Sequence, residues 1–175
     1  MLRRSERRTR ALELYARLVE QGRRPAFYAC CGVPDTVDGR FDMIVLHVFL
    51  VLRRLKAEGR AGREAGQALF DVMFDDMDRS LREMGVGDFD VGKRVKAMAR
   101  SFYGRLAAYE EALTSDDAVL EAALRRNLFG TVEPAGAHLA ALAGYMRCEA
   151  TALEAQKGGD IIEGRVSFGA PPEPA

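Results

Sequence analysis

The chain has 175 residues, enough for one domain that buries about 70% of its unfolded surface without disulfide or metal support. Its 26 basic and 26 acidic side chains balance, which excludes a global attraction to nucleic acid or anionic lipid, so electrostatic recognition has to be regional. Three cysteines, including the neighbours Cys30 and Cys31, do not form a disulfide framework and indicate a reducing compartment. The basic N-terminus has no apolar signal core, so we expect an unexported, soluble protein.

The N-terminal segment predicts a basic amphipathic helix that is capped by Ser5 and ends at about Gln21. Eight arginines against three glutamates give residues 1–24 a charge of +5. We interpret this charge as a solvated face, with a partner site as the alternative. After Pro25 the sequence predicts a short helical turn that breaks at Gly32.

An apolar run from Phe41 to Leu55 dominates the next segment, and from Met43 to Leu52 only His47 is polar. As a helix this ten-residue stretch would be about 15 Å long, half of what a bilayer needs, so it is no transmembrane span. It has no polar face and must be covered on all sides, which predicts a buried central helix. We expect His47 to be a core histidine with a polar partner, and a haem or metal ligand is the alternative.

Apolar periodicity predicts four further helices after a loop marked by glycines 59, 62 and 66. They span about residues 67–84, 88–113, 117–129 and 134–156, with Asp88 or Asp90 as the cap of the second. The fold class is therefore all-α, a single-domain bundle of about six helices around the buried central helix. Residues 1–24 form a basic helix packed on the domain at 25–168, where residues 160–168 dock in extended form, and residues 169–175 are a disordered tail.

An acidic group on the third long helix could suggest a metal site. It consists of Asp71, Asp75, Asp76, Asp78 and Glu83. No calcium-loop glycine and no Glu-x-x-His motif accompanies it, so we interpret it as a solvated helix face with i, i+4 pairs such as Asp78 and Arg82. The chain also lacks a phosphate loop and a nucleophile motif. We therefore assign no catalytic, cofactor-binding or metal-binding residue.

Five cations of the following helix form a candidate partner-binding surface. They are Lys93, Arg94, Lys96, Arg100 and Arg105. The first three oppose the positive end of the helix dipole, which a sequence selected for stability alone would avoid. Lys93, Lys96 and Arg100 form a stripe that suits ribosomal RNA, lipid headgroups or an acidic loop of a partner, and pairing with the preceding aspartates is the alternative.

Four methionines lie on the apolar sides of the same two helices. They are Met73, Met77, Met84 and Met98. A flexible thioether fills irregular gaps in a core, which is our interpretation, and it also adapts to a varied apolar partner, which is the alternative.

Several segments resemble the ubiquinol-cytochrome c chaperone family in order and spacing. They are GVPDT at 32–36, GRFDMIVLHVFLVLRRL at 39–55, DMDRSLREMGVGD at 76–88, SFYGRLAAYEEALTSDD at 101–117, AALRRNLF at 122–129 and GDIIEGRVSF at 159–168. The motif positions to which we assign structural roles are Asp35, Arg40, Phe41, Asp42, His47, Asp76, Asp78, Arg82, Glu83, Gly85, Gly87, Asp88, Phe102, Tyr103 and Tyr109. A likeness over residues 25–168 is far more specific than one short motif.

The resemblance implies an all-helical chaperone for the assembly of the respiratory cytochrome bc complex (complex III), without enzyme activity or cofactor, that binds nascent or apo cytochrome b. In mitochondrial members it also implies work at the ribosome, near the tunnel exit, and a small partner subunit. The chain starts almost at the domain, so we interpret it as a bacterial member, cytoplasmic or at the inner face of the cytoplasmic membrane, with no DNA partner. The alternatives are a ribosome- or RNA-associated module and a cofactor-handling protein that uses His47.

Overall fold

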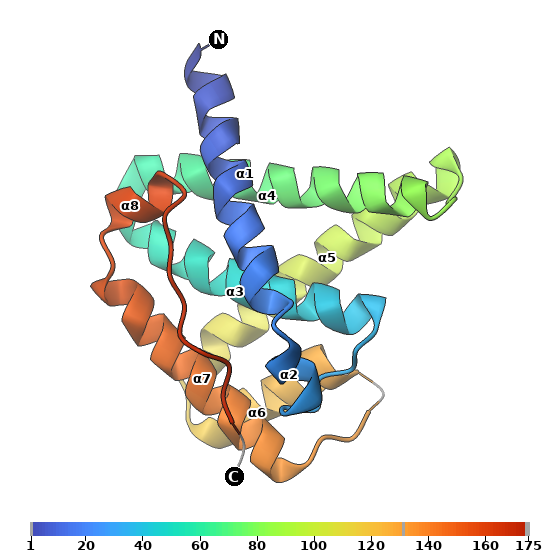
Figure 1. Ribbon diagram of the computed structural model, residues 1–175, viewed down its shortest axis with the longest axis vertical. Helices are drawn as coiled ribbons and strands as arrows, with labels where there is room; N and C mark the ends of the chain where they lie inside the picture. Colours follow the sequence, from blue (N-terminus) through green and yellow to red (C-terminus); the bar gives the residue numbers. More distant parts are fainter. Residues whose placement is uncertain (1, 131, 174–175) are drawn as a thin grey trace.

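The computed structural model describes residues 2–130 and 132–173, with side chains from residue 4 onward. These residues form helices and their connections and contain no strand, so the predicted all-α class is confirmed (Figure 1). The elements are α1 (Leu2–Gly22), α2 (Pro25–Ala29), α3 (Val37–Leu55), the 3-10 turn η1 (Lys56–Glu58), α4 (Gly59–Glu83), α5 (Asp88–Leu113), α6 (Asp117–Leu124), the π turn η2 (Arg125–Phe129), α7 (Gly136–Ala155) and α8 (Gly158–Ile162).

The central helix α3 is buried by its neighbours, as predicted. It packs against α1, α4, α5, α7 and α8, and every residue from Met43 to Val51 is buried. The Thr36 hydroxyl oxygen starts the helix by accepting a hydrogen bond from Gly39 N at 3.1 Å. Arg54, at the other end, donates to Leu153 O at 2.9 Å, so the C-terminus of α3 also holds that of α7.

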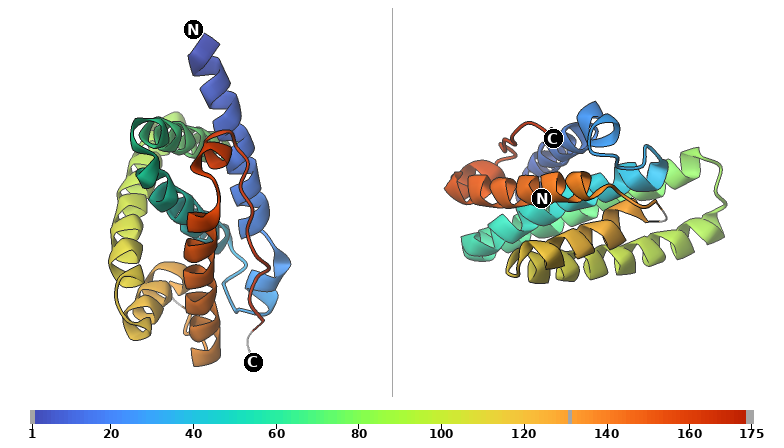
Figure 2. Two further views of the ribbon diagram at one scale, coloured as in Figure 1. Left: turned by 90° about the vertical axis from the view of Figure 1, so that its left-hand side faces the viewer. Right: turned by 90° about the horizontal axis from the view of Figure 1, so that it is seen from below.

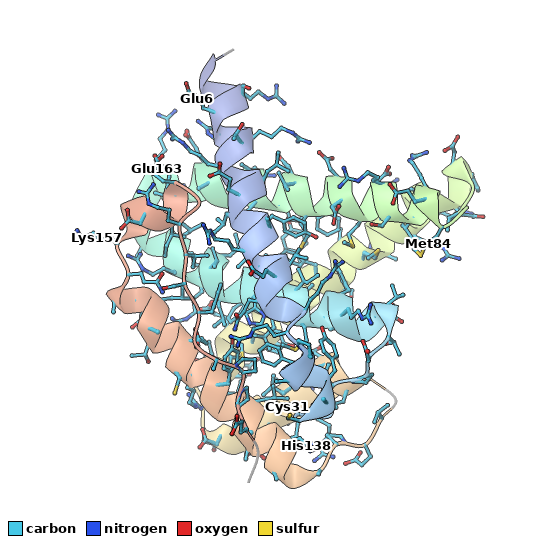
Figure 3. The ribbon with its side chains drawn as sticks, in the orientation of Figure 1. Glu6, Cys31, Met84, His138, Lys157 and Glu163 are labelled. Atoms are coloured by element: carbon cyan, nitrogen blue, oxygen red, sulfur yellow. The ribbon has the colours of Figure 1, made fainter. Side chains whose placement is uncertain are left out.

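The helices around α3 lie on two opposite sides. Figure 2 shows α1 and the C-terminal segment along one side of the molecule, α5 along the other, and α3 between them. We call the hairpin of α4 and α5, with its turn at residues 84–87, the arm, and this turn projects away from the other helices (Figures 1 and 3). Gly85 takes a φ of 80°, which residues with a side chain rarely adopt, and so ends α4 sharply.

The loop predicted at glycines 59, 62 and 66 is wrong, because α4 already begins at Gly59. Two of these glycines instead allow close packing on the preceding segment. A Cβ atom on Gly62 would lie 1.9 Å from Leu55 O, and one on Gly66 would lie 3.1 Å from Leu52 Cδ2. Gly62 therefore allows close approach to the backbone carbonyl of Leu55, and Gly66 allows close packing of the Leu52 side chain.

Several predicted helix ends also differ. Ser5 lies inside α1 and caps nothing, and Gly87 is the N-cap of α5, so Asp88 and Asp90 occupy its first turn. Carboxylates in that turn interact favourably with the helix dipole without a capping hydrogen bond. The segment at 160–168, expected to be extended, begins within α8.

The tail differs from the expected disorder in residues 169–173. Gln21 Nε2 donates to Gly169 O at 2.8 Å, and Cys31 Sγ donates to Pro172 O at 3.3 Å. Composition predicted disorder because the tail has little apolar surface, whereas backbone hydrogen bonds to buried side chains offset the entropy of ordering it. The last two residues of the predicted tail lie outside the described part of the chain.

We expect Gly62→Ala to lower the free energy of unfolding by about 1–3 kcal/mol, because the new methyl group meets a backbone carbonyl that cannot move alone. Gly104→Ala is the matched control, since a Cβ there meets no atom within 4 Å, and it should raise stability by up to about 1 kcal/mol through helix propensity. Urea denaturation measures both. A Gly62→Ala variant as stable as the wild type would contradict the close packing.

Candidate partner-binding surface and the core that positions it

His47 is completely buried in α3 and hydrogen-bonded at both ring nitrogens. Nδ1 lies 2.7 Å from Met43 O and Nε2 lies 2.8 Å from the hydroxyl of Tyr145 in α7. Gln21 of α1 donates from Nε2 to the same hydroxyl at 2.8 Å. The predicted core histidine with a polar partner is therefore confirmed by this geometry, which leaves neither nitrogen free for a metal ion or haem iron.

The groups at the two ends of this network, Met43 O and Gln21 Nε2, determine the direction of every hydrogen bond in it. Met43 O can only accept, so Nδ1 of His47 carries the proton and donates. Burial lowers the pKa of His47 to about 4, so the ring is neutral and Nε2 accepts from the Tyr145 hydroxyl. That hydroxyl oxygen in turn accepts from Gln21. The side chains of His47, Tyr145 and Gln21 are thus hydrogen-bonded to one another in the core, and none of them is charged.

A second polar group ties α3 to α5. Asp42 Oδ1 lies 2.8 Å from Arg105 Nη2, and both side chains are largely buried. Burial raises the pKa of Asp42 to about 6, although the nearby guanidinium of Arg105 lowers it. Tyr109, one turn further along α5, is fully buried beside them. Arg105 therefore supports the packing of α5, which sets it apart from the four other cations of the predicted surface.

Those four cations are exposed. Lys93, Arg94, Lys96 and Arg100 form no ion pair with any residue that the structure describes. The aspartates of α4, which were the alternative partners, pair elsewhere: Asp75 with Arg8, Asp76 with Arg79 and Asp78 with Arg82. The i, i+4 spacing of Arg79 and Glu83 also predicts an ion pair, but Arg79 pairs with Asp76 instead.

Three members of the acidic group of α4, Asp75, Asp76 and Asp78, thus have arginine partners, and Asp71 accepts from Gln67 at 2.8 Å. Asp76 Oδ2 also accepts from the Tyr15 hydroxyl at 3.0 Å, so it joins α4 to α1. Among residues 2–130 and 132–173, no three His, Cys, Asp or Glu side chains lie close enough together to hold a metal ion. Asp75 and Asp76 link α4 to α1, through Arg8 and Tyr15.

Sequence reasoning did not include in the predicted surface two aromatic side chains that extend the row of cations on α5, although it assigned one of them, Tyr103, a structural role. Phe89 is 78% exposed and Tyr103 is 58% exposed. With Lys93, Lys96 and Arg100 they lie within about 80° of arc on the helix surface, at 3.6 residues per turn. Lys93 Nζ lies 4.2 Å from the centre of the Phe89 ring. The spacing from Phe89 to Lys93, one helical turn, was the signal in the sequence. We call these five residues the α5 outer face.

A row of soft apolar side chains follows the face of α4 that meets α5. Phe70, Met77 and Met84 recur every seven residues, and Phe70 stacks on Tyr103 with 5.6 Å between ring centres. Phe70 and Met77 are half-buried and Met84, near the turn in Figure 3, is 58% exposed. We call these three residues the arm seam. It is an incompletely covered apolar strip beside the exposed cations.

Most of the remaining motif positions fix turns or fill the core. Arg40 Nε donates to Asp35 at 2.6 Å, and Arg82 bridges Asp78 in α4 and Asp88 in α5. Among the others, the apolar side chains of Phe41 and Phe102 are half-buried and buried, and the charged side chain of Glu83 is exposed.

None of the described helices is both long enough and apolar enough to cross a bilayer.

The sequence profile of the family described as Ubiquinol-cytochrome C chaperone matches residues 29–168. The chain belongs to this family. The crystal structure of the Cbp3 homolog from Brucella abortus is 38% identical and superposes with a TM-score of 0.84, covering 96% of this chain and 93% of that one. The family match therefore includes the arm, and the likeness to the crystal structure extends over 96% of the chain.

Two relatives give the scale of the likeness. The human Ubiquinol-cytochrome c reductase complex assembly factor 1 is 33% identical over 159 residues, which are 90% of this chain and 53% of the human protein. The Saccharomyces cerevisiae Protein CBP3, mitochondrial, is 33% identical over 107 residues, which are 59% of this chain and 32% of the yeast protein. The chain thus spans about half the length of its human relative.

We expect His47→Ala to destabilise the protein by about 3 kcal/mol at neutral pH, through a lost hydrogen bond and a cavity. Burial places the pKa of folded His47 below its ordinary value of 6.5, so its contribution is present above pH 6.5 and is lost as pH falls toward 4. The difference between wild type and variant should therefore shrink by about 1.4 kcal/mol per pH unit in that window. Thermal unfolding across pH measures it. An unchanged Tm for His47→Ala would refute the structural role.

We expect Arg105→Met to cost about 3 kcal/mol at about pH 8, because it leaves a buried carboxylate without its cation. Asp42 has a higher pKa in the folded than in the unfolded protein, so its protonation favours the folded state. This contribution to stability is lost as pH rises through about 6. The variant should therefore recover stability at about pH 5, where Asp42 is protonated. The double variant Asp42→Asn/Arg105→Met is the control and should lose this pH dependence. A cost independent of pH in the single variant would refute the pairing.

Proposed function

We propose that this protein is an assembly chaperone that binds newly made cytochrome b during biogenesis of the respiratory cytochrome bc complex. The observation that supports the proposal is the family match over residues 29–168, together with a 38% identical Cbp3 homolog whose structure covers 96% of the chain. The human relative is named as an assembly factor of the ubiquinol-cytochrome c reductase complex. Because such a client enters the membrane as it is made, we propose that the protein acts at the inner face of the cytoplasmic membrane.

The arm seam is the surface that we assign to this client. A partly synthesised membrane protein exposes apolar helices of varied shape, and a chaperone needs an apolar surface that adapts to them. Met77 and Met84 supply flexible thioethers, and Phe70 supplies an aromatic ring held by its neighbours Phe74 and Tyr103. The seam offers such a surface without unfolding any of the core.

The function proposed is binding and not catalysis. Two buried groups whose pKa values depart from ordinary ones are occupied in packing: His47 by Met43 and Tyr145, and Asp42 by Arg105. Membership of a chaperone family agrees with this use of the polar groups.

A photoreactive amino acid at Met77 should crosslink to cytochrome b in cells that are assembling the complex, because the seam is open on one side. The matched control is Leu12, a 47% exposed apolar residue of α1, which should give no such product. Mass spectrometry of the crosslinked species identifies the partner. Cytochrome b crosslinked equally from both positions, or from neither, would contradict the proposed surface.

A further inference from the structure

The α5 outer face consists of Phe89, Lys93, Lys96, Arg100 and Tyr103, which are all exposed, and along one edge the Tyr103 ring stacks on Phe70 of α4. Its cations form no ion pair with a residue in the described part of the chain, although the fold places many carboxylates elsewhere. From Phe89 to Tyr103 the face extends over about 21 Å of one straight helix. An aromatic ring stands at each end and the charges lie between them. Such an arrangement contributes little to folding and requires another explanation.

The shape of this face is shallow. The positions beside the cations carry small residues, Gly92, Ala97 and Gly104. A Cβ atom on either glycine would meet nothing within 4 Å, so packing inside the protein does not require glycine there. Figure 2 shows α5 along the side of the molecule opposite α1 in both views. The face can therefore meet a broad, flat surface without interference from the other helices.

We propose that the α5 outer face docks on the surface of an anionic phospholipid bilayer. Lys93, Lys96 and Arg100 would meet lipid phosphates, for which clusters of basic residues on one helix face are suited. The rings of Phe89 and Tyr103 would enter the headgroup region, where aromatic side chains are favoured. The arm would lie along the membrane with its helix axis near the surface plane.

Charge complementarity alone would also fit RNA, but the chemistry of the face favours lipid. Between Phe89 and Tyr103 the face carries no amide and no aliphatic hydroxyl that could recognise bases or sugars. Met84 and Phe89, both exposed beside the turn of the arm, are apolar and gain more from the acyl boundary than from phosphates. Asp88 is paired with Arg82, and Asp90 points to the side of α5, about 100° from Phe89.

This inference does not depend on the client proposed above, because it concerns purified protein and lipid only. The probe is sedimentation with vesicles of phosphatidylcholine, alone or mixed with phosphatidylglycerol, at low and high salt. We expect the wild type to bind the mixed vesicles at least about tenfold more tightly than the neutral ones, and salt should weaken this binding.

The triple variant Lys93→Gln/Lys96→Gln/Arg100→Gln should bind the mixed vesicles at least about tenfold more weakly than the wild type. The matched control removes three other exposed arginines, Arg17, Arg23 and Arg24, and should stay within about twofold of the wild type. Circular dichroism of both variants establishes that they are folded.

A second readout uses the absence of tryptophan from the chain. The single tryptophan of Phe89→Trp should shift its emission to the blue on mixed vesicles, because the ring leaves water. Leu12→Trp, on α1, should show no shift. Neither variant removes a charge or a buried group, so both are expected to fold.

Four outcomes would overturn the proposal: equal binding to neutral vesicles, undiminished binding by the folded triple variant, loss of binding in the arginine control alone, or an unshifted Phe89→Trp emission. If instead the wild type ignored vesicles but sedimented with ribosomes in a manner dependent on the three cations, the face would be an RNA surface and the lipid proposal wrong. The crosslinking result at Met77 decides the client separately, so either proposal can fail alone.

Discussion

A helix that is buried on every side needs cover from several other segments, and a polar group in its middle also needs a partner from one of them. In α3 that group is His47, which obtains its partner from Tyr145 of α7. Tyr145 is held by Gln21 of α1, which also holds the backbone of Gly169. An unpaired imidazole in this core would cost several kcal/mol, of order the whole margin of stability of a small domain. The arrangement of α1, α7 and the C-terminal segment around α3 depends on that requirement.

The position of the exposed surface follows from the same core. Arg105 and Tyr109 on the inner side of α5 are fixed by Asp42 and by burial against α3. Arg147 of α7 donates to Leu113 O at 3.0 Å and so holds the C-terminal end of α5. Once the inner side is fixed, the helical repeat determines which residues face outward. A recognition surface on such a helix is more rigid than one on a loop.

Periodicity in the sequence was sufficient to predict the central helix, the long helices and the burial of His47. It could not predict the partner of His47, because Tyr145 lies 98 residues away and many polar side chains could have filled that position. It misjudged glycines 62 and 66, since a glycine needed for close packing looks the same as one needed for a turn. Arg105 was grouped with its exposed neighbours because the carboxylate opposite belongs to another helix.

The residues that carry the family likeness around the arm differ from the residues that form the α5 outer face. The segment at 76–88 builds the turn of the arm: Gly85 reverses the chain, Gly87 starts α5, and Arg82 joins Asp78 to Asp88 across the turn. These residues set how α5 is presented. The segment at 89–100, which contains the three outward cations, lies between two of the family-like segments and belongs to neither. The three cations are exposed and form no ion pair with a described residue, so replacing them would leave the packing of α5 on α3 intact.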